Sequence, residues 1–343
     1  MSQLIAIPLH RPSATHPAAR PIAPDSAERG EISLELALRH SGRHRVVVRY
    51  EISGAVDAPL LLVAGGISAH RHVRANACDA SPGWWESQGC VGSLLHPDRS
   101  RVIGFDWIGS DGTLDAVIDP ADQADAFAAA LDALGIAHVD AFIGASYGAM
   151  VALQFGARHA TRVGRVVAIS GAHRAHPWSS ALRALQRRAV VLGALQCDER
   201  QGLALARQLA MLSYRTPAEF DARFGGASVS GSIVRTAAED YLDHCSATWL
   251  ERATPTGFLR LSESIDLQDL DPAAVTVPLT VVAVRQDLLV PLDDLRALAR
   301  RAGGHAELHV IDSSYGHDAF LKEPRAIATI LARALASAVE VAA

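Results

Sequence analysis

Apolar residues follow two different spacings along this chain. Short, mostly apolar segments are typical of strands buried inside a sheet, and they occur at 60–64, 101–106, 139–142, 165–170, 279–284 and 307–311. Helical spacing follows several of them, most clearly at Phe127, Leu131 and Leu134 and again over residues 150–158. A last helix is expected from about Pro324. Because strands and helices alternate, we predict a mostly parallel central sheet with helices on both faces.

The first part of the chain differs from this pattern. Residues 1–30 are rich in Pro, Ala, Ser and His and show little periodicity, so we expect a loose N-terminal arm. Two strand-like segments follow at 32–38 and 46–52, with a turn at 41–43 between them.

The alternation stops between residues 173 and 261. Residues 180–192, 200–212 and 237–250 have helical patterns there, and Gly193 is expected to end the first of these helices. Enzymes with this kind of sheet carry a lid in such an insertion. The predicted organisation is therefore an arm (1–30), a core (31–172), a helical lid (173–261) and a second part of the core (262–343).

A Gly-x-Ser-x-Gly sequence lies between the 139–142 strand and the 150–158 helix. It reads Gly144-Ala145-Ser146-Tyr147-Gly148. A strand, this sequence and a helix together form the nucleophile elbow of α/β hydrolases, in which the glycines let the strand and the helix approach closely. We predict that fold, with Ser146 as the nucleophile. A chance match in a chain rich in Gly and Ala is the alternative, and the flanking elements disfavour it.

A serine needs a base and an orienting carboxylate to act as a nucleophile. The α/β hydrolase order is Ser, Asp, His. Asp287 follows the 279–284 strand and His317 follows the 307–311 strand, so both are expected at the carboxyl ends of strands, where such sheets hold ligands. Asp312 is the rival carboxylate, but it is close to His317 in sequence.

The oxyanion of an acyl-transfer reaction needs backbone donors. One is expected to be the amide of Tyr147, directly after the nucleophile. The other is expected from the loop after the 60–64 strand, at Ile67 or Gly66. The alternative interpretation of Gly65-Gly66 is a plain tight turn.

Composition narrows the class of protein. Of the 343 residues, 49% are hydrophobic, so the chain can bury a large core, and the net charge of −5 does not favour nucleic acid or an acidic membrane as a partner. The four cysteines show no metal-ligand spacing and no disulfide framework, which fits a reducing cytoplasm and no bound metal. We see neither a secretory signal nor an apolar run of transmembrane length.

A series of further motifs resembles one family. From about residue 59 to the C-terminus the chain resembles the homoserine O-acyltransferases, the MetX-like group of the α/β hydrolase superfamily. The motifs are the elbow, Pro82–Trp85, Ser170-Gly171, Leu185–Arg187, Ala206–Arg215, Phe220–Phe224, Tyr241–His244 and Tyr315–Asp318.

The resemblance implies an activity and its substrates. In that family a serine takes an acyl group from acyl-CoA, the co-substrate, and passes it to the hydroxyl of L-homoserine in methionine biosynthesis, without a bound cofactor. The family's lid arginine, which binds the acceptor carboxylate, falls on Arg207. The aspartate after the catalytic histidine falls on Asp318 and would hold the acceptor ammonium. A homodimer through the lid helices is also implied.

The chain departs from the family pattern near the predicted acyl site. The elbow contains Ala145 and Tyr147, the segment 108–113 replaces a longer glycine-rich loop, and basic residues crowd the loop after the oxyanion turn: His70, Arg71, His72 and Arg74. A succinyl group ends in a carboxylate that needs a cation. We therefore predict succinyl-CoA as the donor, with Arg71 or Arg74 reading the far carboxylate and the Tyr147 hydroxyl as a further donor. The alternative is that these arginines face water.

Other functions stay open from the sequence alone. Acetyl-CoA as the donor and serine as the acceptor are alternatives within the same chemistry. An esterase or thioesterase would use the same Ser146, Asp287 and His317. A non-catalytic binding protein of this fold belongs to a different class, and the complete set of three residues argues against it.

Overall fold

The structure is a computed structural model that describes residues 26–90, 93–195 and 198–336. Most of the predicted N-terminal arm therefore lies outside the described residues. Its last part was predicted wrongly, because the first strand already begins at Ala27 and pairs with the second along its whole length.

Eight strands form the central sheet in the order β1-β2-β4-β3-β5-β6-β9-β10. β1 and β2 form an antiparallel hairpin, β2 also runs antiparallel to β4, and every pairing from β4 onward is parallel. The mostly parallel sheet is thus as predicted. The strand bounds are β1 (Ala27–Leu38), β2 (Gly42–Ser53), β3 (Leu60–Ala64), β4 (Arg101–Phe105), β5 (Ala141–Ala145), β6 (Val166–Ile169), β9 (Leu279–Val284) and β10 (Ala306–Ile311).

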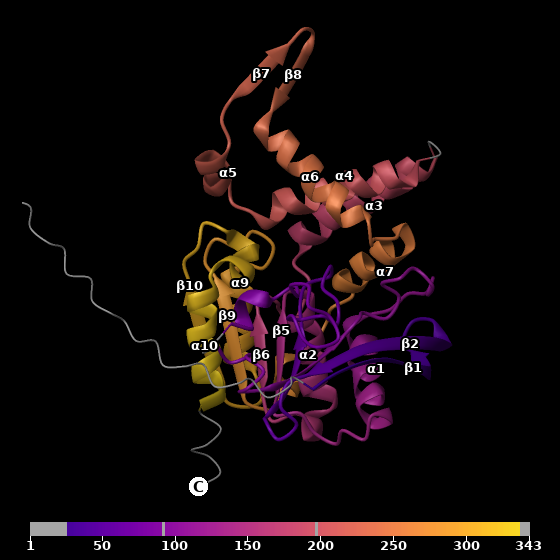
Figure 1. Cartoon of the computed structure of the whole chain (residues 1–343), viewed down its shortest axis with the longest axis vertical. Coiled ribbons are helices and arrows are strands. Elements are labelled where there is room, and N and C mark those ends of the chain that lie inside the picture. The colour runs from indigo at the N-terminus through magenta and orange to yellow at the C-terminus, as the bar shows by residue number, and fades with distance from the viewer. Residues whose placement is uncertain (1–25, 91–92, 196–197, 337–343) are drawn as a thin grey trace, which may run out of the picture.

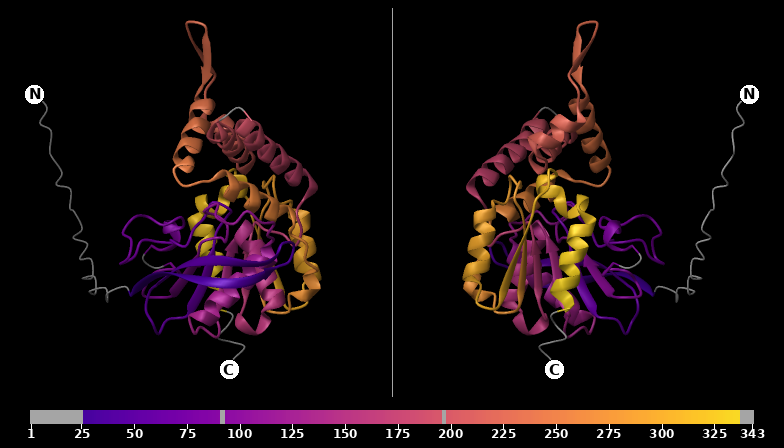
Figure 2. Two further views of the ribbon diagram at one scale, coloured as in Figure 1. Left: turned by 90° about the vertical axis from the view of Figure 1, so that its right-hand side faces the viewer. Right: turned by 90° about the vertical axis from the view of Figure 1, so that its left-hand side faces the viewer.

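Successive side chains of the central strands enter two different apolar layers. In β3, Leu62 and Ala64 pack with α1 (Pro120–Ala133), α2 (Tyr147–Arg158) and α8 (Leu292–Arg301). Leu61 and Val63 pack with α10 (Pro324–Ala336) on the other face. Helices therefore cover both faces (Figure 2), which explains why the central strands are apolar at nearly every position.

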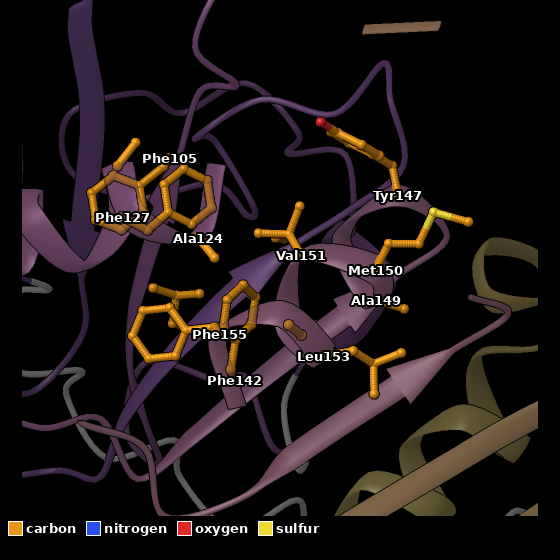
Figure 3. Packing of buried hydrophobic residues seen from close by; sticks show 14 of the residues in the cluster. Phe105, Ala124, Phe127, Phe142, Tyr147, Ala149, Met150, Val151, Leu153 and Phe155 are labelled. Carbon is orange, nitrogen blue, oxygen red and sulfur yellow. The ribbon is translucent and has the colours of Figure 1, made fainter. Parts of the chain in front are cut away.

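Aromatic rings fill the layer beneath α1 and α2. Phe127 stacks on Phe105 with ring centroids 4.6 Å apart, and Phe142 meets Phe155 edge-on at 5.6 Å. Figure 3 shows Tyr147 at one end of this cluster, where α2 begins. This packing fixes the start of α2 against the sheet. It therefore also fixes Ser146, the residue that precedes the helix.

A long insertion separates β6 from β9. It contains α3 (Pro177–Leu195), α4 (Glu199–Tyr214), α5 (Pro217–Arg223), the hairpin β7 (Ala227–Ser230) and β8 (Ile233–Thr236), α6 (Ala237–Leu250) and α7 (Pro255–Asp266). These helices lie together at one end of the sheet, and the hairpin projects furthest from it (Figure 1). The sequence pattern missed the hairpin and extended the insertion only to residue 261.

Gly193 does not end a helix, as the sequence suggested. α3 continues through it to Leu195, and Gly193 faces Gly202 of α4. A Cβ atom on Gly193 would lie 2.7 Å from the Cα of Gly202, so a side chain there would force the helices apart. The glycine marks a close helix crossing instead.

The remaining elements are short. α9 (Ala319–Lys322) precedes α10, and 3₁₀ turns occur at Glu86–Gln88, Ala160–Arg162, Pro272–Ala274 and Gly316–Asp318. Among the helices of the described ranges, none combines the length and the apolar character that crossing a membrane requires.

Candidate active site

Ser146 lies in a strained turn between β5 and α2. Its φ of 56° is in the left-handed region, which a non-glycine residue rarely adopts, and its amide is held by the carbonyl of Ile169 at 2.8 Å. The two glycines of the motif make the turn possible. A Cβ on Gly144 would lie 2.1 Å from the carbonyl oxygen of Gly148, and one on Gly148 would lie 2.3 Å from that of Ala64.

The side chains of Ser146, His317 and Asp287 form one hydrogen-bonded chain. Oγ of Ser146 lies 2.8 Å from Nε2 of His317, and Nδ1 of His317 lies 2.7 Å from Oδ2 of Asp287. The three residues come from the loops after β5, β10 and β9, which end at the same edge of the sheet. The structure therefore brings together the three residues that the sequence selected.

Asp287 is held in one orientation by the backbone. Its Oδ1 accepts hydrogen bonds from the amides of Leu289 and Val290, at 2.8 and 3.0 Å. The rival carboxylate, Asp312, pairs with Arg285 instead, and its side chain is 63% exposed. Asp312 does not contact His317 through any hydrogen bond found in the described part of the chain.

The charge balance around His317 favours its protonated form. Burial alone would lower the pKa of His317, but the charge of Asp287, its hydrogen bond and the charge of Asp318 together outweigh burial, so the pKa lies above its ordinary value. Such an imidazole is well suited to take a proton from the serine and keep it until a leaving group needs it.

Two backbone amides next to Ser146 make no hydrogen bond to the described protein: those of Tyr147 and Ile67. Tyr147 is the first residue of α2, where amides have no partner within the helix. The turn containing Ile67 is close, since a Cβ on Gly66 would lie 3.9 Å from Oγ of Ser146. Both amides are free to bind an oxyanion.

An outer cavity leads from Ser146 and His317 towards the surface. It passes between the loop after β3, the Gly83–Ser87 segment, α4 and α9, and it reaches the exposed residues Ser87 and Lys322. Arg207 and Asp318, the two residues predicted to bind the acceptor, both line it.

Arg207 is fixed in this cavity by neighbouring aromatic rings. Its guanidinium carbon lies 5.8 Å from the ring centre of Tyr214 and 5.4 Å from that of Trp249. Nη1 donates a hydrogen bond to Oγ of Ser68 at 3.4 Å, whereas Nε is buried without a partner. No carboxylate of the described protein pairs with Arg207, so its charge is available to an anionic ligand.

Asp318 is already paired. Its Oδ2 lies 2.9 Å from Nε of Arg215, and burial raises the pKa of its carboxyl group. A cationic ligand at Asp318 would share this carboxylate with Arg215.

The structure does not bring Arg71 or Arg74 to Ser146. Arg71 forms an ion pair with Asp106 at 2.8 Å. Arg74 is 1% exposed, with its side chain beside Gly54 and Gly89, behind the loop that was expected to form the acyl pocket. Neither arginine lines the two described cavities that contain Ser146, because Arg71 turns to Asp106 and Arg74 packs beside Gly54 and Gly89. The reason given for a succinyl donor was therefore wrong.

The hydroxyl of Tyr147 is also engaged elsewhere. It lies 2.6 Å from Oγ of Ser264 in α7, and both residues are buried. Tyr147 thus ties the elbow to the insertion through this hydrogen bond.

A second, inner cavity meets the first at Ser146, His317 and Tyr214. It lies beneath α3 and α7 and contains residues that the sequence did not single out for function, among them Arg183 and Ser262. Arg183 is one of several arginines in the helical pattern of 180–192, so only its position in the fold distinguishes it. Arg252 was likewise not singled out by the sequence, and it lies in the outer cavity near Arg207.

Within residues 26–90, 93–195 and 198–336, no cluster of three or more His, Cys, Asp or Glu side chains is arranged to hold a metal ion. The arrangement around Ser146 is suited to nucleophilic acyl transfer.

Comparison with known proteins identifies the family. Residues 59–324 match the family described as alpha/beta hydrolase fold. A homoserine O-succinyltransferase of Xanthomonas campestris pv. campestris is 54% identical, and the match covers 98% of this chain and 91% of that protein. A serine O-succinyltransferase of the same species is 32% identical, with 81% of this chain and 89% of that protein covered.

Solved structures agree on the fold. The crystal structure of homoserine O-acetyltransferase from Bacillus anthracis superposes with a TM-score of 0.79, covering 90% of this chain and 97% of that one, at 18% identity. The sequence-based resemblance is confirmed: the chain belongs to the homoserine O-acyltransferase, or MetX-like, family of the α/β hydrolase fold.

Proposed function

We propose that this protein transfers a succinyl group from succinyl-CoA to the hydroxyl of L-homoserine, a step of methionine biosynthesis. The observation that carries the proposal is the position of Ser146, which contacts His317 at the junction of two cavities. One of these contains Arg207 and Asp318, which suit a free amino acid. The 54% identical relative, a homoserine O-succinyltransferase, supports the choice of both substrates.

The first half-reaction forms an acyl-enzyme. His317 takes the proton of Ser146 through Nε2, and Oγ attacks the thioester carbon of succinyl-CoA. The amides of Tyr147 and Ile67 hold the oxyanion of the tetrahedral intermediate. The carbon–sulfur bond then breaks, His317 returns the proton to the sulfur, and CoA leaves with a thiol. Asp287 keeps the imidazole oriented throughout.

The second half-reaction transfers the acyl group to the acceptor. The carboxylate of homoserine binds Arg207, which can meet it with two parallel hydrogen bonds, and the ammonium binds Asp318. The side-chain hydroxyl of homoserine gives a proton to His317 and attacks the carbonyl carbon of the acyl-enzyme. When the ester bond to Ser146 breaks, Oγ takes that proton back, so the enzyme is regenerated without net change.

The insertion has a chemical purpose in this scheme. An acyl-enzyme that meets water is hydrolysed, and the protein would then act as a thioesterase. α3, α4 and α7 cover the inner cavity, whose wall residues are buried or half-buried except Arg174. We assign the insertion the role of a lid that protects the acyl-enzyme until homoserine arrives.

The proposal is tested with purified protein and two donors. Succinyl-CoA or acetyl-CoA is supplied with and without L-homoserine, CoA release is followed by thiol titration, and products are identified by mass spectrometry. We expect O-succinylhomoserine, formed faster than O-acetylhomoserine, and little CoA release without acceptor. CoA release that does not depend on homoserine would identify a thioesterase, and absence of turnover would indicate a binding protein.

The acceptor is tested in the same assay. L-serine replaces L-homoserine at equal concentration, because the serine side chain is one methylene shorter and leaves its hydroxyl further from Ser146 when Arg207 and Asp318 hold the other groups. Faster transfer to serine would reassign the acceptor.

We propose that the protein works as a homodimer through the insertion. Apolar side chains on the outer face of α3 are exposed, namely Leu185, Val191, Leu192 and Leu195, which supports a second copy of this chain as the partner there. Sedimentation equilibrium tests the dimer directly, and a monomer at micromolar concentration would contradict it.

Free thiols at Cys78, Cys90 and Cys245 support a reducing compartment such as the cytoplasm.

A further inference from the structure

We propose that Arg183 recognises the far carboxylate of the succinyl group. This inference rests on the proposed function and replaces the role that the sequence suggested for Arg71 and Arg74. Arg183 projects from α3 into the inner cavity, and the same cavity is lined by Ser146 and His317. A chain attached to Oγ of Ser146 can therefore extend towards Arg183 inside one enclosed space.

The two cavities divide the ligands between them. CoA and homoserine must both reach Ser146 from solvent, and the products must leave again. The outer cavity offers the wider route, since its volume is about 500 Å³ against about 60 Å³ for the inner cavity. The acyl group stays on the enzyme between the two half-reactions. The inner cavity, away from that route, is therefore the place for the part of the acyl group beyond the reacting carbon.

The positive charge around Arg183 is not fully balanced by the neighbouring carboxylate. Arg183 contacts Oδ1 of Asp266 through Nε at 2.7 Å and through Nη2 at 2.6 Å. Arg187 contacts the other oxygen of the same carboxylate at 2.8 Å. Two guanidinium groups thus share one carboxylate, while the side chain of Arg183 is only 12% exposed. A buried charge without a full counter-charge is costly, so a substrate carboxylate would stabilise this cluster.

Hydrogen-bond donors are also available at this position. Nη1 of Arg183 has no partner among the described residues. The side-chain amide of Gln186, one turn along α3, lines the same cavity and makes no hydrogen bond there either. Ser262 completes the polar part of this wall and accepts a hydrogen bond from Arg187 at 3.0 Å.

The other arginine of the inner cavity is less suitable. Arg174 is half exposed, and both Nε and Nη2 contact Oδ1 of Asp294, which lines the same cavity. That pair is neutral as it stands. A carboxylate placed there would meet Asp294, whereas one placed at Arg183 meets an excess of positive charge.

The test compares donors in single variants. For Arg183→Gln we expect kcat/KM with succinyl-CoA, relative to that with acetyl-CoA, to fall roughly 30- to 100-fold, as expected for a lost charged hydrogen bond. Arg183→Lys keeps the charge and should retain part of the preference. Arg188→Gln is the matched control, because this arginine lies on the same helix but is exposed and does not line the inner cavity, and its donor ratio should stay close to that of the unmodified enzyme.

A second measurement uses the unmodified enzyme. Succinamoyl-CoA has the shape of succinyl-CoA but ends in a neutral amide, so the unmodified enzyme should prefer succinyl-CoA and Arg183→Gln should not. An unchanged preference in Arg183→Gln would overturn the role of Arg183, as would equal losses with both donors, which indicate a structural role. An unmodified enzyme that prefers acetyl-CoA would instead overturn the donor in the proposed function.

Discussion

The carboxylate of Asp287 meets the imidazole of His317 where the aspartate side chain has no solvent exposure at all, with Oδ2 lying 2.7 Å from Nδ1. Because backbone amides hold its other oxygen, the carboxylate cannot turn away from the ring. The imidazole therefore presents Nε2 to Ser146 in a fixed direction. Thirty residues separate the two partners, and only the adjacent ends of β9 and β10 bring them together.

Asp287→Asn should lower kcat by about 10³- to 10⁴-fold, because an amide stabilises the wrong tautomer of His317 and cannot balance its positive charge. Asp312→Asn is the matched control, since the same change on an exposed carboxylate should leave kcat unaltered. Steady-state kinetics with succinyl-CoA and homoserine measures both. A larger loss in Asp312→Asn would show that the chain uses the other carboxylate.

The pH profile of kcat/KM reports the protonation of His317. The residue acts as a base only when neutral, and its pKa is raised above the ordinary value of 6.5 because Asp287 and Asp318 together outweigh burial. Activity should therefore rise with pH through a midpoint above 6.5. In Asp287→Asn the carboxylate charge is gone while burial remains, so the midpoint of the residual activity should move to lower pH. A midpoint that does not move would show that the pH profile does not report the protonation of His317 beside Asp287.

Ser146→Ala should abolish transfer, by at least about 10³-fold, because Oγ carries the acyl group. The alanine variant should also fail to show the burst of CoA release that accompanies acyl-enzyme formation, and intact-protein mass spectrometry should find no succinyl adduct. Thermal unfolding monitors the fold in parallel. Transfer that survives with a folded protein would require direct attack of homoserine on the thioester.

Arg207→Ala should raise the KM for homoserine by about 100-fold, because the acceptor carboxylate loses a charged partner in a confined site. The burst of CoA release with succinyl-CoA alone should survive. Arg200→Ala, on the same helix but at the surface, is the control and should change neither quantity. Loss of the burst in Arg207→Ala would place this arginine in the donor half-reaction.

The sequence was sufficient for the features that depend on local pattern and chain order. Alternating apolar strands and helices predicted the sheet, and the motif around Ser146 predicted the close approach of strand and helix at the elbow, because both follow from spacings within a few residues. Asp287 and His317 were found because the chain order and the strand ends constrain where such residues can lie. The structure brings all three together.

The incorrect predictions concern the directions in which side chains point. Arg71 and Arg74 were assigned to the acyl pocket because their loop lies near the oxyanion turn, but adjacency in sequence does not fix direction, and Asp106 attracts Arg71 away. Arg183 lies 37 positions after Ser146 in sequence and reaches its cavity only through the packing of α3 over the sheet. No local pattern carries that information.

Gly193→Leu should destabilise the protein by about 2–3 kcal/mol, even though leucine favours helices more than glycine by close to 1 kcal/mol. The reason is the crossing of α3 and α4, where the new side chain would meet the backbone of Gly202, which cannot move aside. Gly225→Leu is the control, since nothing lies within 4 Å of a Cβ there. Urea unfolding measures the free energies. Because the two helices carry Arg183 and Arg207, the same variant should lose activity with either donor, and a stabilised Gly193→Leu would mean that the helices do not cross closely at this point.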